Sequence, residues 1–196
     1  LPIWHGEIID RVAMQIVAPK EPLPSSLDQN VKASGDMNYF LLAMHVATPG
    51  GAYREPPQAN TYEELLQWFT LPEQIMDREE RSIESLHYLG ESFPVAYPVN
   101  IFLVALTAAY LGCPYKIHPG SFSGWAEPII DDWETRPTFQ FDPENEWWKT
   151  SKQLMEEAAK RADGKYYVSI PDLNGTVELL SRLRGTEPLA IDLFDN

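Results

Sequence analysis

One stretch near the end of the chain changes its hydrophobic periodicity sharply. Tyr166–Ile170 is rich in β-prone side chains, and Pro171–Gly175 carries turn chemistry. The apolar side chains that follow recur at helical spacing until Gly185 provides a helix stop. The pattern predicts a strand, a polar loop and a helix, which is the repeating unit of parallel α/β folds. Ligands bind in those folds at the carboxyl ends of the strands, where Asp172 and Asn174 would lie.

The same two periodicities alternate along the rest of the chain. Strands or extended segments are expected at Ile8–Val17, Phe93–Tyr97 and Tyr115–Ile117. Helices are expected at Leu27–Val46, at Asn100–Leu111 and from Asp142 to about Ala162. Two more helices are expected to begin with capping boxes, Thr61 with Glu64 and Thr70 with Glu73, the second ending at Gly90.

Alternating strands and helices predict an α/β fold with a parallel sheet and helical crossovers. The 196 residues, 44% of them hydrophobic, suit a single domain over residues 1–196 with a sizeable core. A complete (β/α)8 barrel needs about 250 residues. Only three or four strands are expected here, and the final apolar run, Leu189–Leu193, adds no closing unit.

The charge of the chain restricts its partners. With 29 acidic and 15 basic side chains, the formal net charge is −14, so a nucleic acid or an anionic membrane would be repelled. The charge itself is read as a solvated outer face. The longest apolar run, Ile101–Leu111, is too short to cross a bilayer. With one cysteine, Cys113, and no secretion-signal pattern, a cytoplasmic location is expected.

Four segments carry motifs at consistent spacing: Gly6–Val12, Phe93–Asn100, Glu127–Trp133 and Tyr166–Gly185. They are similar to segments of the N-terminal half of the uroporphyrinogen decarboxylase-like superfamily, whose members fold as (β/α)8 TIM barrels. Further signatures resemble a divergent bacterial branch: Trp147-Trp148, Pro171-Asp172-Leu173 and Leu183-Arg184-Gly185. The resemblance implies that this chain is the N-terminal part of such a barrel.

The departures from the family pattern concern its anion-binding residues. The decarboxylases carry two arginines after the first strand, where this chain reads Ile16–Glu21 and offers only Lys20. A lysine lacks the planar fork that grips a carboxylate with two bonds. Where the family has an aspartate for the pyrrole nitrogens, this chain has Val99 or Asn100, depending on register. The resemblance therefore implies a substrate other than uroporphyrinogen, with Lys20 and Asn100 as binding residues.

The expected loop after the strand at Tyr166–Ile170 has two interpretations. Asp172 and Asn174 either orient a substrate as catalytic residues or form the turn that caps the next helix, and the two roles are compatible.

Three further residues are candidates for substrate binding. Trp125 and Glu127 place an aromatic face beside a carboxylate, which suits a ring or a sugar, although such a tryptophan also anchors loops. His118 is a candidate acid or base. Cys113 is expected to be a buried small residue. No metal-ligand spacing and no cofactor motif is evident in this sequence.

Two functions remain open at this point. The resemblance implies a decarboxylase-like lyase or a corrinoid-type methyltransferase acting on a small organic substrate or a methyl carrier. The alternative is a non-catalytic module of the same fold that binds a small molecule or a sugar. If the chain forms only part of a barrel, its unpaired strand edges favour a homodimer.

Overall fold

A computed structural model describes residues 15–20, 59, 61–90, 92–99, 105–117 and 124–195 of the chain. The strands are β1 (Gln15–Pro19), β2 (Leu86–Gly90), β3 (Val95–Ala96), β4 (Tyr115–Ile117), β5 (Gly124–Ala126) and β6 (Tyr167–Val168). The helices are α3 (Tyr62–Thr70), α4 (Pro72–Glu84), α5 (Leu106–Tyr110), α6 (Glu146–Ala162), α7 (Thr176–Arg184) and α8 (Thr186–Asp195). The expected helix at Leu27–Val46 and the expected strand residues before Gln15 lie outside this part.

The strands form three separate two-stranded sheets. β1 pairs with β2 and β4 pairs with β5, both antiparallel, whereas β3 pairs with β6 in parallel. The expected parallel arrangement is therefore found only for the segments around Phe93 and Tyr166. It is wrong for the other two expected strands, since β1 and β4 each pair antiparallel with a strand that the sequence pattern did not indicate. The described residues have a mixed α/β character and contain no closed barrel.

One strand replaces the end of an expected helix. The helix that was expected to reach Gly90 ends at Glu84, and β2 follows it directly. Ser85 closes the helix, its N–H donating to the carbonyl of Arg81 at 3.1 Å. The next residues are β-prone and pair with β1, with Leu86 opposite Pro19. Tertiary pairing thus decided a segment that the sequence pattern had assigned to the helix.

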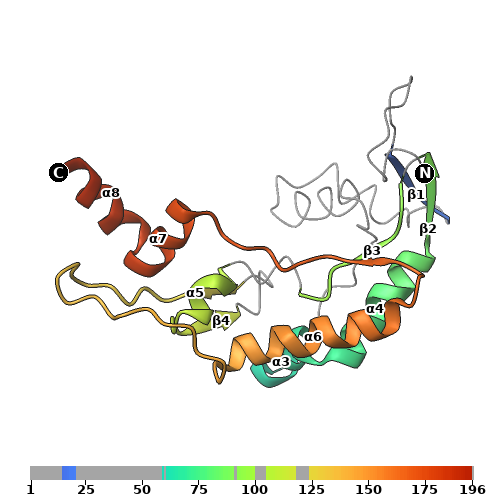
Figure 1. Ribbon diagram of the computed structural model, residues 1–196, viewed down its shortest axis with the longest axis horizontal. Helices are drawn as coiled ribbons and strands as arrows, with labels where there is room; N and C mark the ends of the chain where they lie inside the picture. Colours follow the sequence, from blue (N-terminus) through green and yellow to red (C-terminus); the bar gives the residue numbers. More distant parts are fainter. Residues whose placement is uncertain are drawn as a thin grey trace.

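Helices α3, α4 and α6 pack together along one side of the molecule, and α5 and α7 complete the main core (Figure 1). The largest side chains of this core are completely buried: Leu65, Phe69, Leu106, Ile117, Ile130 and Leu154. A second, smaller cluster lies where α4, α6, β3 and the start of β6 meet: Met76, Ala96, Ala158 and Tyr166. This smaller cluster fixes the parallel strand pair against the helices.

One arginine, Arg184 on α7, joins the last two helices to the loop between β5 and α6. Arg184 donates to both carboxylate oxygens of Asp192, at 2.7 and 3.1 Å, and to the carbonyls of Ile130 and Asp131. The indole N–H of Trp133 donates to the same carboxylate at 2.7 Å. The final apolar run, Leu189–Leu193, therefore belongs to a helix, and that helix is bonded to the loop before α6.

The helix starts confirm one expected cap and correct two others. The Thr61 side chain accepts from the N–H of Glu64 at 3.1 Å, as expected. Thr70 is instead the last residue of α3, and its hydroxyl donates to the carbonyl of Leu66. The long helix starts at Glu146 rather than Asp142, because the side chain of Asn145 caps the N–H of Trp148 at 3.0 Å.

The caps give a first testable prediction. Thr61→Ala removes a cap and is expected to lower the free energy of unfolding by about 1 kcal/mol. Thr70→Ala leaves every helix start intact, so its cost is expected to stay below about 0.5 kcal/mol. Urea denaturation of both variants distinguishes the two sites. Equal losses would contradict the assignment of Thr61 as the cap.

Candidate functional site

The loop that follows β6 contains the two residues expected to be catalytic. It starts at the carboxyl end of the parallel pair, where the backbone N–H of Ser169 donates to the carbonyl of Ala96. Asp172 is exposed on this loop, and Asn174 is partly buried. The location agrees with the place at which parallel α/β folds bind ligands.

The contacts of Asn174 are incomplete in one respect. Its backbone N–H donates to the hydroxyl of Thr107, which is on α5, at 3.3 Å. Its side-chain oxygen Oδ1 is buried and has no hydrogen-bond partner among the described residues. A buried acceptor without a partner costs free energy, so this amide is a position where a donor group would be favoured.

In the described structure, no hydrogen bond supports a helix-capping role for Asp172 or Asn174. The N-cap of α7 is Gly175, which has no side chain to bond the first turn. No hydrogen bond to the Asp172 carboxylate is found among the described residues. The loop therefore presents this carboxylate to solvent at the end of the strand.

Trp125 and Glu127 lie together on a different element, the antiparallel β4–β5 pair. Trp125 is opposite Lys116 and is 38% exposed, whereas Tyr115 and Ile117 point into the core. The Glu127 carboxylate pairs with the ammonium group of Lys116. The backbone N–H of Glu127 donates to the carbonyl of Pro114 at 2.8 Å. The outer face of the pair thus combines an aromatic ring with an ion pair.

The other expected binding residues are not brought to either place. Lys20 is exposed just after β1, and its N–H donates to the carbonyl of Ser85 at 2.8 Å. Figure 1 shows β1 and β2 at one end of the molecule and α7 and α8 at the other. Asn100 and His118 lie outside the described residues. The structure groups Asp172 with Asn174 and Trp125 with Glu127, and leaves Lys20 apart from both pairs.

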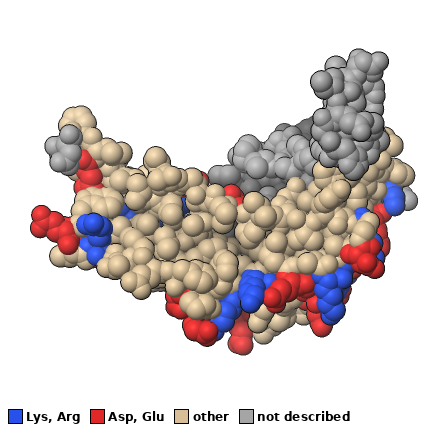
Figure 2. All heavy atoms as spheres, viewed as in Figure 1, with Lys and Arg blue, Asp and Glu red and all other residues tan. Residues whose placement is uncertain are grey.

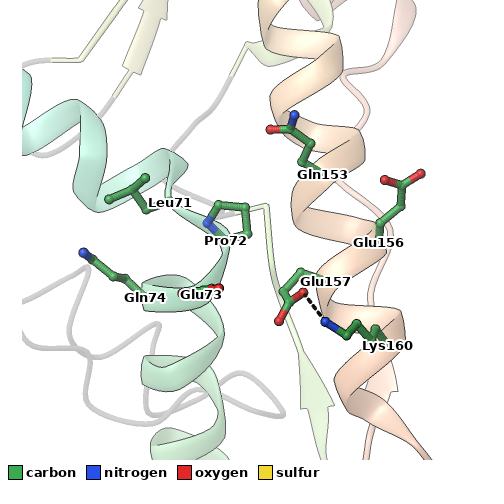
Figure 3. Close-up of a pocket in the computed structure, with 8 residues that line it drawn as sticks. All are labelled: Leu71, Pro72, Glu73, Gln74, Gln153, Glu156, Glu157 and Lys160. Carbon is green, nitrogen blue, oxygen red and sulfur yellow. Dashed lines mark ion pairs between the residues drawn. The ribbon is translucent and has the colours of Figure 1, made fainter.

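A groove that the sequence did not indicate lies between α6 and the junction of α3 and α4. Its volume is about 480 Å³, and Figure 3 shows residues from both sides of it. The lining residues are Leu71, Pro72, Glu73, Gln74, Gln153, Glu156, Glu157 and Lys160. None of the expected site residues belongs to this set. Its members come from helices far apart in the sequence, so no local pattern announces it.

The charged side chains are mixed rather than gathered by sign. Figure 2 shows Lys and Arg interspersed with Asp and Glu along the edge formed by α3, α4 and α6, and a largely uncharged face beside it. Several of these charges are paired within α6, such as Lys152 with Glu156 and Arg161 with Glu157. This distribution is that of solvated helix surfaces.

The described residues contain no group of three or more His, Cys, Asp and Glu side chains arranged to hold a metal ion. Within the same part of the chain, no helix has both the length and the apolar composition needed to span a membrane.

Cys113 is buried, as expected, and this gives a second testable prediction. Burial raises the pKa of its thiol from 9.0 to about 11, so the reactive thiolate fraction near pH 8 falls by about 100-fold. Reaction of the native protein with an aromatic disulfide reagent should therefore be at least this much slower than after denaturation in urea. Equal rates in the two states would contradict the buried position.

No protein-family model, no curated protein and no solved structure matches this chain. The family resemblance described above consequently stays a prediction.

Proposed function

We propose that this chain is the N-terminal part of a uroporphyrinogen decarboxylase-like barrel whose active-site rim includes the loop after β6. One observation carries the proposal: the parallel pairing of β3 with β6 leads directly into the loop that holds Asp172 and Asn174. In (β/α)8 barrels, catalytic side chains come from the carboxyl ends of parallel strands. The barrel goes beyond the one parallel pair observed, since its other strands would have to come from outside the described residues.

The proposed substrate is a small organic molecule or a methyl carrier, and the proposed reaction is a decarboxylation or a methyl transfer. The sequence lacks the two arginines that would hold the carboxylates of uroporphyrinogen. A single exposed carboxylate and a partly buried amide suit a smaller ligand with hydrogen-bond donors. In this proposal Asp172 and Asn174 orient the substrate by accepting those bonds. Lys20, which lies beside β1, would neutralise a carboxylate only of a substrate that reaches from this loop toward β1.

A ligand screen with site variants tests this proposal. Intrinsic tryptophan fluorescence would be titrated with uroporphyrinogen, a corrinoid, and a set of small carboxylic acids and methylated amines. For a ligand that binds, Asp172→Asn is expected to weaken affinity by about tenfold or more, the loss of one charged hydrogen bond. Asn174→Ala is expected to weaken it by about three- to tenfold, the loss of one neutral hydrogen bond. Asp163→Asn is the matched control, because Asp163 is an exposed aspartate at the end of α6.

Product analysis then separates a catalyst from a binder. Release of CO₂ or transfer of a methyl group from the bound ligand would support the enzyme. Tight binding of uroporphyrinogen with CO₂ release would contradict the proposed substrate class. Unchanged affinity in both Asp172 and Asn174 variants would contradict the proposed site.

The outer face of the β4–β5 pair favours the second candidate, a non-catalytic module that binds a ring or a sugar. Trp125 is partly exposed beside the ion pair of Lys116 with Glu127, and aromatic faces next to polar groups bind sugars. Trp125→Ala should then abolish binding of an oligosaccharide, whereas Asp172→Asn should leave it unchanged. The reverse pattern would assign the ligand to the loop after β6.

Two further expectations belong to this proposal. The described part shows β3 and β6 paired only with each other, and open strand edges favour association, so a homodimer is proposed. Light scattering that found a monomer at micromolar concentration would contradict it.

A reducing, cytoplasmic setting is proposed because the sequence has a single cysteine and that residue is buried.

A further inference from the structure

Residues 165–175 form an extended strap between two helices. Figure 1 shows this segment returning from the end of α6, past β3, to the start of α7. It is fastened at three places: at Tyr166, at the short backbone pairing with β3, and at the bond from Asn174 to Thr107. The three fastenings differ greatly in strength.

The fastening at Tyr166 is the strong one. Its ring is buried in the cluster with Met76, Ala96 and Ala158. Its hydroxyl donates to the Glu80 carboxylate at 2.9 Å, and burial together with that carboxylate raises the pKa of the phenol. The hydroxyl therefore stays protonated and remains a donor across the usual pH range.

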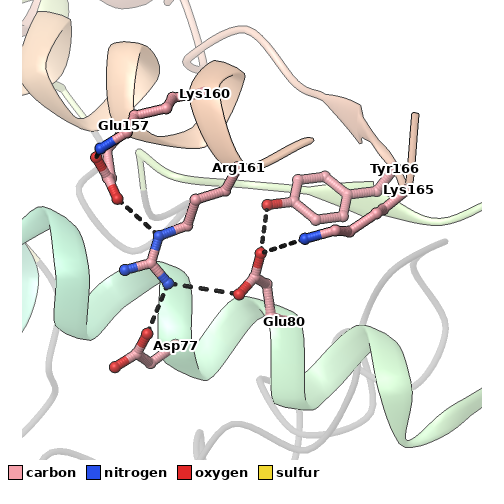
Figure 4. Close-up of polar contacts among 7 residues, drawn as sticks. All are labelled: Asp77, Glu80, Glu157, Lys160, Arg161, Lys165 and Tyr166. Carbon is pink, nitrogen blue, oxygen red and sulfur yellow. Dashed lines mark hydrogen bonds and ion pairs between the residues drawn. The ribbon is translucent and has the colours of Figure 1, made fainter. Parts of the chain in front are cut away.

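The carboxylate that receives this bond is itself held in place. Arg161 contacts Glu80 at 3.4 Å, and Figure 4 shows the same guanidinium reaching Asp77 and Glu157. Those two contacts are 2.6 and 2.7 Å long. The cluster joins α4 to α6, so Tyr166 is tied to two helices at once.

The strap beyond Tyr166 is held weakly. Most of its apolar side chains face solvent, with Tyr167 65%, Ile170 73% and Leu173 60% exposed, and only Val168 packs against the smaller cluster. Tyr167 makes one edge-on contact with Phe93, with ring centroids 4.9 Å apart. The strand that pairs with β3 is only two residues long, so few backbone bonds hold it. Segments with few buried contacts open locally at low cost.

The closed strap also leaves a polar atom unsatisfied. In the described part of the chain, the buried Oδ1 of Asn174 has no hydrogen-bond partner. Opening would expose this oxygen to water and recover the lost hydrogen bond, which lowers the cost of opening further. Few contacts thus stabilise the closed position, and the unsatisfied Oδ1 of Asn174 destabilises it.

We propose that residues 167–174 open locally as a strap that pivots at Tyr166, while α4, α6 and Tyr166 stay folded. Opening exposes the side chain of Asn174 and the hydroxyl of Thr107 together, and a ligand with a donor group would bind the uncovered amide. The motion does not depend on the proposed function. It extends that function, because a ligand would reach the loop after β6 only when the strap is open.

Hydrogen exchange of the native protein tests the motion directly. The amides of Tyr167, Ser169 and Asn174 are expected to exchange at least about tenfold faster than the amide of Leu154 in α6, after correction for intrinsic rates. Their rates should not change with low urea concentrations, because a local opening exposes little surface. Rates equal to that of Leu154, with the same dependence on urea, would overturn the proposal, since the strap would then open only by global unfolding.

A matched pair of variants tests the fastening to β3. Ser169→Pro removes the N–H that donates to Ala96 and is expected to speed exchange at Tyr167 and Asn174 by about three- to tenfold. Ser169→Ala keeps that N–H and loses only a hydroxyl that donates to the carbonyl of Ile170, so exchange should stay unchanged. In both variants the amide of Leu154 should keep its native rate. Faster exchange at Leu154 in step with the strap, or an equal response to both substitutions, would contradict a local opening.

Discussion

Replacing Phe69 with alanine is expected to lower the free energy of unfolding by about 3–5 kcal/mol, the largest effect of any single substitution considered for this chain. The side chain is only 2% exposed, and it belongs to the cluster that joins α3, α4, α5 and α6. Truncation removes its buried surface and leaves a cavity that neighbours such as Leu65 and Leu154 cannot fill without moving. Urea denaturation followed by tryptophan fluorescence measures the loss.

The control for this substitution is Phe194→Ala. Phe194 lies on α8 and is 89% exposed, so its removal should change the stability by less than about 0.5 kcal/mol. The comparison separates burial from residue type, since both variants lose the same side chain. A cost below about 1 kcal/mol at Phe69 would show that this residue is outside the core.

Replacing Gly124 with alanine is expected to cost about 1–3 kcal/mol through overpacking. A methyl group at this position would lie 1.8 Å from the hydroxyl oxygen and 2.3 Å from Cζ of Tyr115. The tyrosine cannot easily yield, because it is buried and its ring packs edge-on against Trp147 with centroids 4.7 Å apart. The strain would therefore reach the β4–β5 pair and the start of α6.

Gly175→Ala is the matched control for the substitution at Gly124. Gly175 has a negative φ of −65°, and no atom lies within 4 Å of the position a methyl group would take. Its replacement should change the stability by about 0.5 kcal/mol or less. Thermal unfolding of the two variants gives the comparison. Similar melting temperatures for both would contradict the close approach of Gly124 to Tyr115.

The sequence was most informative where a signal acts locally. The helix at Thr176–Arg184, its stop at Gly185 and the cap at Thr61 all depend on neighbouring residues, and the structure confirms them. The alternation of strands and helices predicted a parallel sheet, and one parallel pair, β3 with β6, is present in the described residues. The antiparallel β1–β2 pair was not, because a short β-prone run after a helix contains no information about its distant partner.

For the candidate site, too, the sequence predicted only what neighbouring residues determine. Asp172 and Asn174 were placed in the loop after a strand by sequence alone, and they lie there. The separation of Lys20 from that loop depends on which strand β1 pairs with, and no local pattern fixes that choice. The unpartnered Oδ1 of Asn174 is likewise a property of packing. A buried, unbonded atom leaves no trace in the order of residues.

The bond between Arg184 and Asp192 has a consequence for any shortened version of the chain. Removing the last helix would also withdraw the carboxylate that receives the Arg184 fork and the indole N–H of Trp133. Trimming at this end would thus loosen the segment around Trp133, far back along the polypeptide. The N–H groups of Ile129 and Ile130 would still donate to the carbonyl of Leu183 on α7. Limited proteolysis that clipped α8 should therefore make the bonds near Trp133 the next ones to be cut.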